Sequence, residues 1–120
     1  MMNPFLQVAV GGAMGAIGRY AVYRMMPVTW AATALVNILG SFAMGLLAAL
    51  LAQRLGQAWA PLLMTGILGG FTTFSAFSLD VLTIWERGEG PLALAYVAGS
   101  VLLSLGAVAA GLELGRGIRA

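Results

Sequence analysis

The sequence contains no cysteine and no histidine, and it carries very few charges. The absence of cysteine excludes disulfides and thiol nucleophiles, and the absence of histidine removes the imidazole base and a common metal ligand. Charged side chains make up 8% of the 120 residues, whereas soluble domains carry about 25%. A soluble domain this small could not cover its surface with so few charges. The chain is therefore expected to lie in lipid. An enzyme is not expected, because no nucleophile–base pair or metal cluster is present.

Apolar residues dominate what remains, with a mean hydropathy of +0.96. They fill four stretches of about the 20 residues that a membrane-spanning helix needs. The stretches cover residues 4–26, 30–53, 59–85 and 91–115, and the connections between them are short. We predict a single all-α membrane domain of four transmembrane helices.

Positive charge is nearly balanced between the two expected faces of this domain. One face carries the amino terminus with Arg54, Arg116 and Arg119, and the other carries Arg24 and Arg87, plus Arg19 if it reaches the interface. The positive-inside rule needs a clear asymmetry, which is missing. Either a weak bias sets one orientation, or the chain inserts both ways and pairs with an inverted copy of itself. The arginines form no basic tract, so a nucleic-acid partner is not expected.

Glycine and alanine recur at the small-xxx-small spacing that lets helices approach closely in lipid. The pairs are Gly11 with Gly15, Gly12 with Ala16, Gly66 with Gly70, and Gly111 with Gly115. Glycine is frequent in membrane helices in any case, but four distributed pairs favour a compact oligomer.

Two spans carry polar residues spaced by four, which places each set on one helix face. The sets are Thr33, Asn37 and Ser41 in the second span, and Tyr96, Ser100 and Ser104 in the fourth. Serine and threonine can bond to the carbonyl of their own preceding turn. A carboxamide has two donors and two acceptors to satisfy. Asn37 is therefore expected to bridge helices or to face water.

The third span contains the stretch GILGGFTTFSAF, residues 66–77. Its glycines and adjacent threonines form helices poorly, and irregular backbone at mid-membrane is tolerated only inside protein or beside a cavity. We predict a helix break near Gly69–Thr73. Phe74 and Phe77 then share one face of the following helix, where they contact lipid, pack in the protein or line a site.

Two charged residues are expected to need partners within the membrane. Asp80 could pair with an arginine, interact with Ser78 or lie near the interface. Arg19 is expected to snorkel towards water or to face an aqueous vestibule.

Three motifs together resemble the Fluc family of small fluoride channels: GGAMGAIGRY at residues 11–20, NILGSFAMG at 37–45, and GILGGFTTFSAF at 66–77. The resemblance covers nearly the whole chain. It implies an antiparallel, dual-topology homodimer with two fluoride pores, in the plasma (inner) membrane of a bacterium. It also implies passive export of cytoplasmic fluoride, which gives fluoride resistance, and a structural sodium ion at the dimer centre.

The resemblance also implies which residues carry the function. The fluoride pore would be lined by Thr33, Asn37, Thr73, Phe74, Ser75, Phe77, Tyr96, Ser100 and Ser104. Arg19 would lie near a vestibule, and the backbone carbonyls of Gly69 and Thr72 would hold the sodium ion. The chain departs from the family at Ala76, where threonine is frequent, and at Asp80, where glutamate is common.

Two other functions remain open at the level of sequence. A small dual-topology multidrug-efflux transporter would need a membrane-embedded carboxylate for proton exchange, and Asp80 is the only candidate near an apolar core. A purely structural membrane subunit would explain the glycines, but not the aligned polar residues or the predicted break.

Overall fold

The computed structural model describes residues 2–118, and these form helices joined by short connections. Helix α1 spans Pro4–Met25, α2 Thr29–Leu50, α4 Phe74–Glu86 and α5 Gly90–Gly117, and the short α3 covers Gly69–Phe71. Two wider, π-helical segments continue them: η1 (Leu51–Leu55) extends α2, and η3 (Pro61–Leu68) precedes α3. A single 3-10 turn, η2 (Gln57–Trp59), lies between the two.

Local sequence signals account for several of the helix ends. Asn3 caps α1, because its side-chain oxygen accepts a hydrogen bond of 2.7 Å from the Phe5 amide. Pro27 stops α1, since the residue before a proline avoids helical dihedrals. Gly56 and Gly88 end the second and third spans with φ of +82°, a conformation that glycine adopts without strain.

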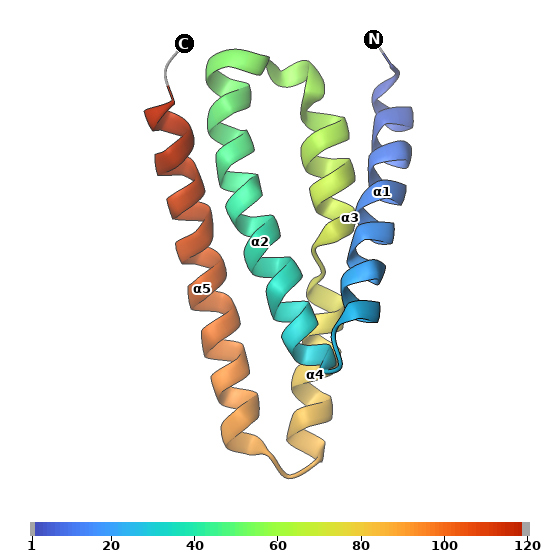
Figure 1. The fold of residues 1–120 in the computed structure, drawn as a ribbon, viewed down its shortest axis with the longest axis vertical. Helices are drawn as coiled ribbons and strands as arrows, with labels where there is room; N and C mark the ends of the chain where they lie inside the picture. Colours follow the sequence, from blue (N-terminus) through green and yellow to red (C-terminus); the bar gives the residue numbers. More distant parts are fainter. Residues whose placement is uncertain (1, 119–120) are drawn as a thin grey trace.

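Four helical segments are long and apolar enough to cross a membrane: Pro4–Met25, Thr29–Leu55, Gln57–Glu86 and Gly90–Gly117. The all-helical, four-span prediction is therefore confirmed for the described residues. Both ends of the described chain lie at the same end of the molecule (Figure 1), as an even number of spans requires.

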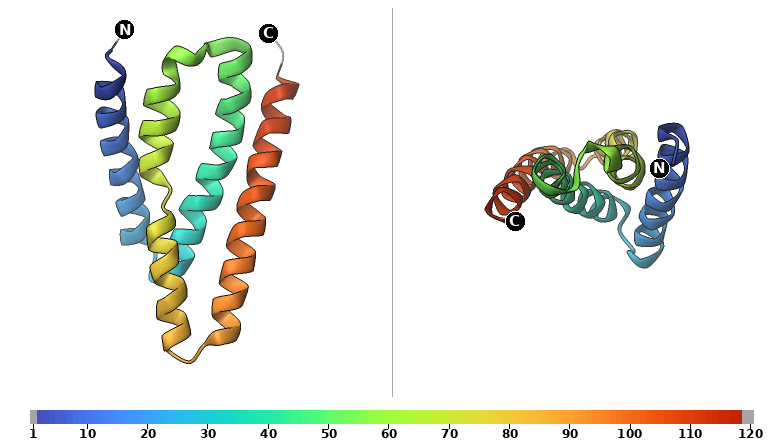
Figure 2. Two further views of the ribbon diagram at one scale, coloured as in Figure 1. Left: turned by 180° about the vertical axis from the view of Figure 1, so that it is seen from behind. Right: turned by 90° about the horizontal axis from the view of Figure 1, so that it is seen from above.

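The helices form a thin, curved layer. The molecule measures 50 × 30 × 20 Å, and the view from above shows α5, α2, the third span and α1 as successive neighbours (Figure 2). Contacts are extensive between α2 and α5 and between α1 and η3, but sparse between α1 and α2. One buried apolar cluster, Phe77, Ile84, Ala93 and Tyr96, joins α4 to α5. Many large apolar side chains elsewhere are exposed.

The glycine pairs are used inside the chain. A Cβ at Gly11 would lie 2.5 Å from the Leu62 carbonyl oxygen, and a Cβ at Gly70 would lie 2.6 Å from that of Gly12. On α5, a Cβ at Gly111 would overlap the carbonyl oxygen of Phe42. The small residues thus bring α1 against the third span and α5 against α2. The expectation of a compact oligomer stays a prediction, because the spacing alone does not say which helix is the neighbour.

Candidate functional site

The third span is interrupted at Thr72 and Thr73. Both have extended backbone, with φ/ψ of −92°/158° and −153°/122°. The helix resumes at Phe74, because the Thr73 hydroxyl accepts a hydrogen bond of 3.1 Å from the Ala76 amide and acts as the N-cap of α4. The predicted break is confirmed.

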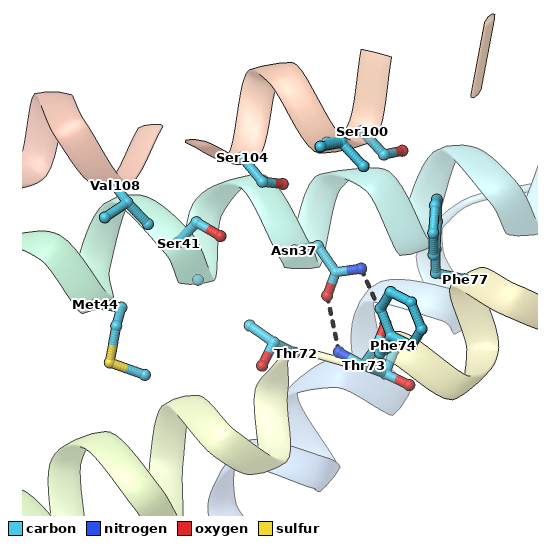
Figure 3. A pocket seen from close by; sticks show the side chains of 12 residues that line it. Asn37, Ser41, Met44, Thr72, Thr73, Phe74, Phe77, Ser100, Ser104 and Val108 are labelled. Atoms are coloured by element: carbon cyan, nitrogen blue, oxygen red, sulfur yellow. Dashed lines mark hydrogen bonds between the residues drawn. The ribbon is translucent and has the colours of Figure 1, made fainter. Parts of the chain in front are cut away.

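Asn37 of α2 holds this break through a pair of hydrogen bonds. Its side-chain nitrogen donates to the Thr73 carbonyl at 2.9 Å, and its side-chain oxygen accepts from the Thr73 amide at 2.8 Å. Figure 3 shows the two bonds side by side. The expectation that Asn37 bridges helices is confirmed. One N–H of the carboxamide is committed to Thr73, and the other has no partner within residues 2–118.

These capping bonds release two backbone carbonyls. In a continuous helix the Thr73 amide would bond to the Gly69 carbonyl, but it donates to Asn37 instead. The Ala76 amide would likewise bond to the Thr72 carbonyl, but it donates to the Thr73 hydroxyl. The carbonyl oxygens of Gly69 and Thr72 are thus freed from helical bonding, and oxygens of this kind are the ligands that hard cations prefer.

Arg19 forms a hydrogen bond with the backbone carbonyl of Gly70, the residue after Gly69. Its Nε donates to the Gly70 oxygen at 3.0 Å from a partly buried position. A cation at the carboxyl end of a helix is favourable, because the exposed carbonyls there are partially negative. Arg19 therefore stabilises the end of α3. Sequence alone did not indicate this contact, and a place for Arg19 at a vestibule stays a prediction.

An open groove of about 310 Å³ runs along the break, between α2 and α5. Six of the residues implied to line a pore lie around it: Asn37, Thr73, Phe74, Phe77, Ser100 and Ser104 (Figure 3). The remaining lining residues are Gly40, Ser41, Met44, Thr72, Val101 and Val108. Of these, Ser41 belonged to the predicted stripe on α2, but the resemblance gave it no role. No charged side chain lines the groove, so its polar groups are all neutral.

The two phenylalanines of the groove differ in their surroundings. Their ring centroids are 5.4 Å apart with planes at 49°. Phe77 is 8% exposed and packs against the Tyr96 ring at 5.2 Å. Phe74 is 76% exposed, so most of its ring is left open to a partner, to lipid or to an ion.

Ser100 is a polar residue of the groove whose hydroxyl lacks a hydrogen-bond partner in the described part of the chain. Its side chain is 7% exposed, and within residues 2–118 its Oγ has no hydrogen-bond partner. A buried hydroxyl in this state is uncommon and requires an explanation, such as an ion or a water. Ser100 lies on the groove lining, and the donor capacity of its buried hydroxyl is unused there.

Three residues implied for the pore lie away from the groove lining. Thr33 is fully buried, donates to the Thr29 carbonyl at 3.1 Å, and has the Tyr23 hydroxyl at 2.7 Å. Ser75 is exposed, with its hydroxyl 3.3 Å from that of Thr73. Tyr96 donates to the Asp80 carboxylate at 3.0 Å, so the partner of Asp80 is a tyrosine and none of those expected. Helical spacing placed Thr33 with Asn37 and Tyr96 with Ser100, but it could not show where the lining ends.

The arginines of the connections and helix ends lie near the two ends of the molecule, as the sequence analysis predicted. The segment η1 and the last turn of α5, which carry Arg54 and Arg116, lie at the end of the molecule where the described chain begins and stops. The last turn of α1, which carries Arg24, and the connection between α4 and α5, which carries Arg87, lie towards the opposite end (Figure 1). Arg116 is 3.4 Å from Glu113, an exposed ion pair of a kind that contributes little to stability. Arg119, the remaining arginine in this count, lies outside the described residues.

Comparison with known proteins gives one family for the whole of this architecture. The model of the family described as CrcB-like protein, Camphor Resistance (CrcB), matches residues 6–112. Curated relatives named fluoride-specific ion channel FluC include those of Paracoccus denitrificans, at 61% identity, and Cereibacter sphaeroides, at 51%. A third, from Hyphomonas neptunium, is 50% identical, and each match covers 98% of both chains. The chain belongs to the CrcB-like (Fluc) family, as its three glycine-rich motifs indicated.

Proposed function

We propose that this protein is a fluoride-selective ion channel that lets cytoplasmic fluoride leave the cell passively and so gives fluoride resistance. The observation that carries this proposal is the near full-length relationship to channels named fluoride-specific, at up to 61% identity. The bacterial origin of these relatives supports the inner membrane as the location. A channel of this kind carries out no covalent chemistry and is not an enzyme.

The groove offers the chemistry that fluoride requires. Fluoride is small and strongly hydrated, so donors must replace its water as it passes. Asn37 retains one free N–H, and Ser100 and Ser104 supply hydroxyls. An aromatic ring carries a positive edge, so Phe74 and Phe77 can contact an anion edge-on. Conduction needs binding that is weak enough for release, and a groove without arginine or lysine meets that need.

The working unit is proposed to be an antiparallel homodimer with two pores. A thin layer of helices leaves much apolar surface exposed, including the Phe74 ring. The groove is open in the single chain, and a second chain would close it. The two ends carry nearly equal numbers of arginines, which is compatible with insertion in both orientations. Lipid and an inverted copy of the chain are thus the expected partners, with fluoride as the permeant ion.

A structural sodium ion is proposed at the dimer centre, held by the carbonyls of Gly69 and Thr72. These two oxygens are free of helical hydrogen bonds, and oxygens are the ligands that hard cations prefer. Two oxygens are too few for a hard cation, and the same pair from an inverted copy would double the number. When bound, the cation supplies fixed positive charge in a region of low dielectric constant.

Ion efflux from liposomes tests the function. Purified protein is reconstituted with fluoride inside, and release is followed with a fluoride electrode after a potassium ionophore removes the charge barrier. We expect rapid fluoride release and no detectable chloride release in matched chloride-loaded liposomes. Equal chloride release would refute selectivity, and the absence of any flux would favour a structural subunit.

A further inference from the structure

The slot at Gly40 on α2 receives the side chain of Thr72 at the helix break. A Cβ built on Gly40 would overlap the Thr72 Cγ2 and lie 3.7 Å from its Cβ. Gly40 is buried and lines the groove. It stands one turn from Asn37, which places both on the same face of α2. The two residues of the break therefore dock on one strip of α2: Thr73 through its backbone on Asn37, and Thr72 through its methyl group on Gly40.

Thr72 cannot easily turn out of this slot. Its hydroxyl donates to the Leu68 carbonyl at 2.9 Å, which fixes the side-chain rotamer with the methyl group towards α2. Its amide also donates to Leu68, at 3.0 Å. An added methyl at position 40 would therefore force one of two changes. Either Thr72 rotates and loses its hydroxyl bond, or the break moves away from α2 and the Asn37–Thr73 pair opens.

We propose that Gly40 is a positioning residue for permeation: the space left by its missing Cβ fixes the Thr72–Thr73 break against α2. This inference rests on the proposed function only in its consequence for flux. The break sets where the freed Thr72 carbonyl lies, and it sets where α4 begins and hence where Phe74 stands on the groove. Gly40 touches neither ion in this account and acts through Thr72.

The proposal is tested by adding a methyl group at position 40 and removing one at position 72. Gly40→Ala adds the methyl group that the slot excludes, and Thr72→Ser removes the methyl group that fills it while keeping the hydroxyl for Leu68. We expect Gly40→Ala to slow fluoride efflux at least about tenfold, because overpacking of a tight contact shifts the neighbouring backbone. The double variant Gly40→Ala/Thr72→Ser should recover most of the efflux. Gly106→Ala is the matched control, since a Cβ there meets nothing within 4 Å, and it should behave as wild type.

Hydrogen exchange supplies a readout that does not depend on flux. Peptides that contain Thr72 and Thr73 should exchange faster in Gly40→Ala, because the Thr73 amide loses its acceptor on Asn37, and the double variant should restore protection. Where Gly40→Ala yields no folded protein, recovery of folded protein in the double variant supports the proposal. Wild-type behaviour of Gly40→Ala, or a double variant as impaired as the single one, overturns it. If the wild type itself passes no fluoride, the proposed function fails, and the exchange pattern still decides the role of Gly40.

Discussion

The side chain of Asn37 pairs with the backbone of Thr73 as a neighbouring strand would, with bonds of 2.9 and 2.8 Å. The pair satisfies the backbone groups of a residue that has left the helix in the middle of a membrane span. Unsatisfied groups at that depth cost several kcal/mol. Asn37 thus stabilises the break and also brings a remaining N–H to the groove.

Asn37→Ala tests this double role. Thr73 would lose both partners, and we expect the free energy of unfolding in detergent to fall by about 1–3 kcal/mol. Fluoride efflux should fall at least about tenfold, because a groove donor and the fixed break are both lost. Leu39→Ala, at a half-exposed site on the same helix, is the control and should retain efflux. Unchanged stability in Asn37→Ala would contradict the structural part of this account.

Substitutions at Phe74 and at Phe77 should have different effects on flux and on stability. Phe77 is buried against Tyr96, so truncation of Phe77 to alanine should cost about 3–5 kcal/mol of stability. Phe74 is mostly exposed, so Phe74→Ile should leave the chain folded and the dimer intact while greatly reducing fluoride efflux. Thermal unfolding, size-exclusion chromatography and efflux on the same preparations measure the difference. Normal efflux in Phe74→Ile would remove Phe74 from the pore.

Ser100→Ala should reduce efflux without loss of stability. The Ser100 hydroxyl is buried without a partner in the described part of the chain, so its removal relieves a desolvation penalty. We expect a melting temperature equal to or above that of the wild type, together with slower fluoride release. Ser78→Ala is the comparison and should retain efflux, because the Ser78 hydroxyl is exposed and, within residues 2–118, bonds only to the Phe74 carbonyl. A clear loss of stability in Ser100→Ala would show that the hydroxyl has a structural partner.

Local chemistry made the break and its bridge predictable. Glycines beside two threonines disfavour helix, and the carboxamide of Asn37 has more bonding groups than its own helix can satisfy. Both expectations needed only the properties of the residues themselves. The same holds for the four spans, which follow from length and hydropathy.

The pairing of helices was not predictable in this way. Gly11 and Gly70 serve the contact of α1 with the third span, although their spacing suits an oligomer equally well. The Arg19 contact with Gly70 and the Tyr23 contact with Thr33 depend on which helix is the neighbour. No pattern within one helix carries that information.

Dual insertion can be tested with single cysteines, because the chain has none of its own. Gln57→Cys, in the connection that follows Arg54, and Val28→Cys, in the connection between α1 and α2, lie at opposite ends of the molecule and leave every arginine in place. In cells, each should be labelled by a membrane-impermeant thiol reagent in part from outside and in part only after permeabilisation. The reason is the near balance of arginines between the two ends, which leaves insertion without a strong preference. Complete labelling of each variant from a single side would refute the inverted dimer.

The reversal potential of wild-type channels in a planar bilayer tests the central claim most directly. Fluoride and chloride are placed in opposed gradients, and the pH is then changed on one side only. We predict a reversal potential at the equilibrium potential of fluoride, unmoved by the pH step, because the groove is lined by neutral donors and needs no proton to release its ion. A reversal potential that follows chloride, or one that shifts with the pH gradient as a proton-coupled transporter requires, would contradict the account.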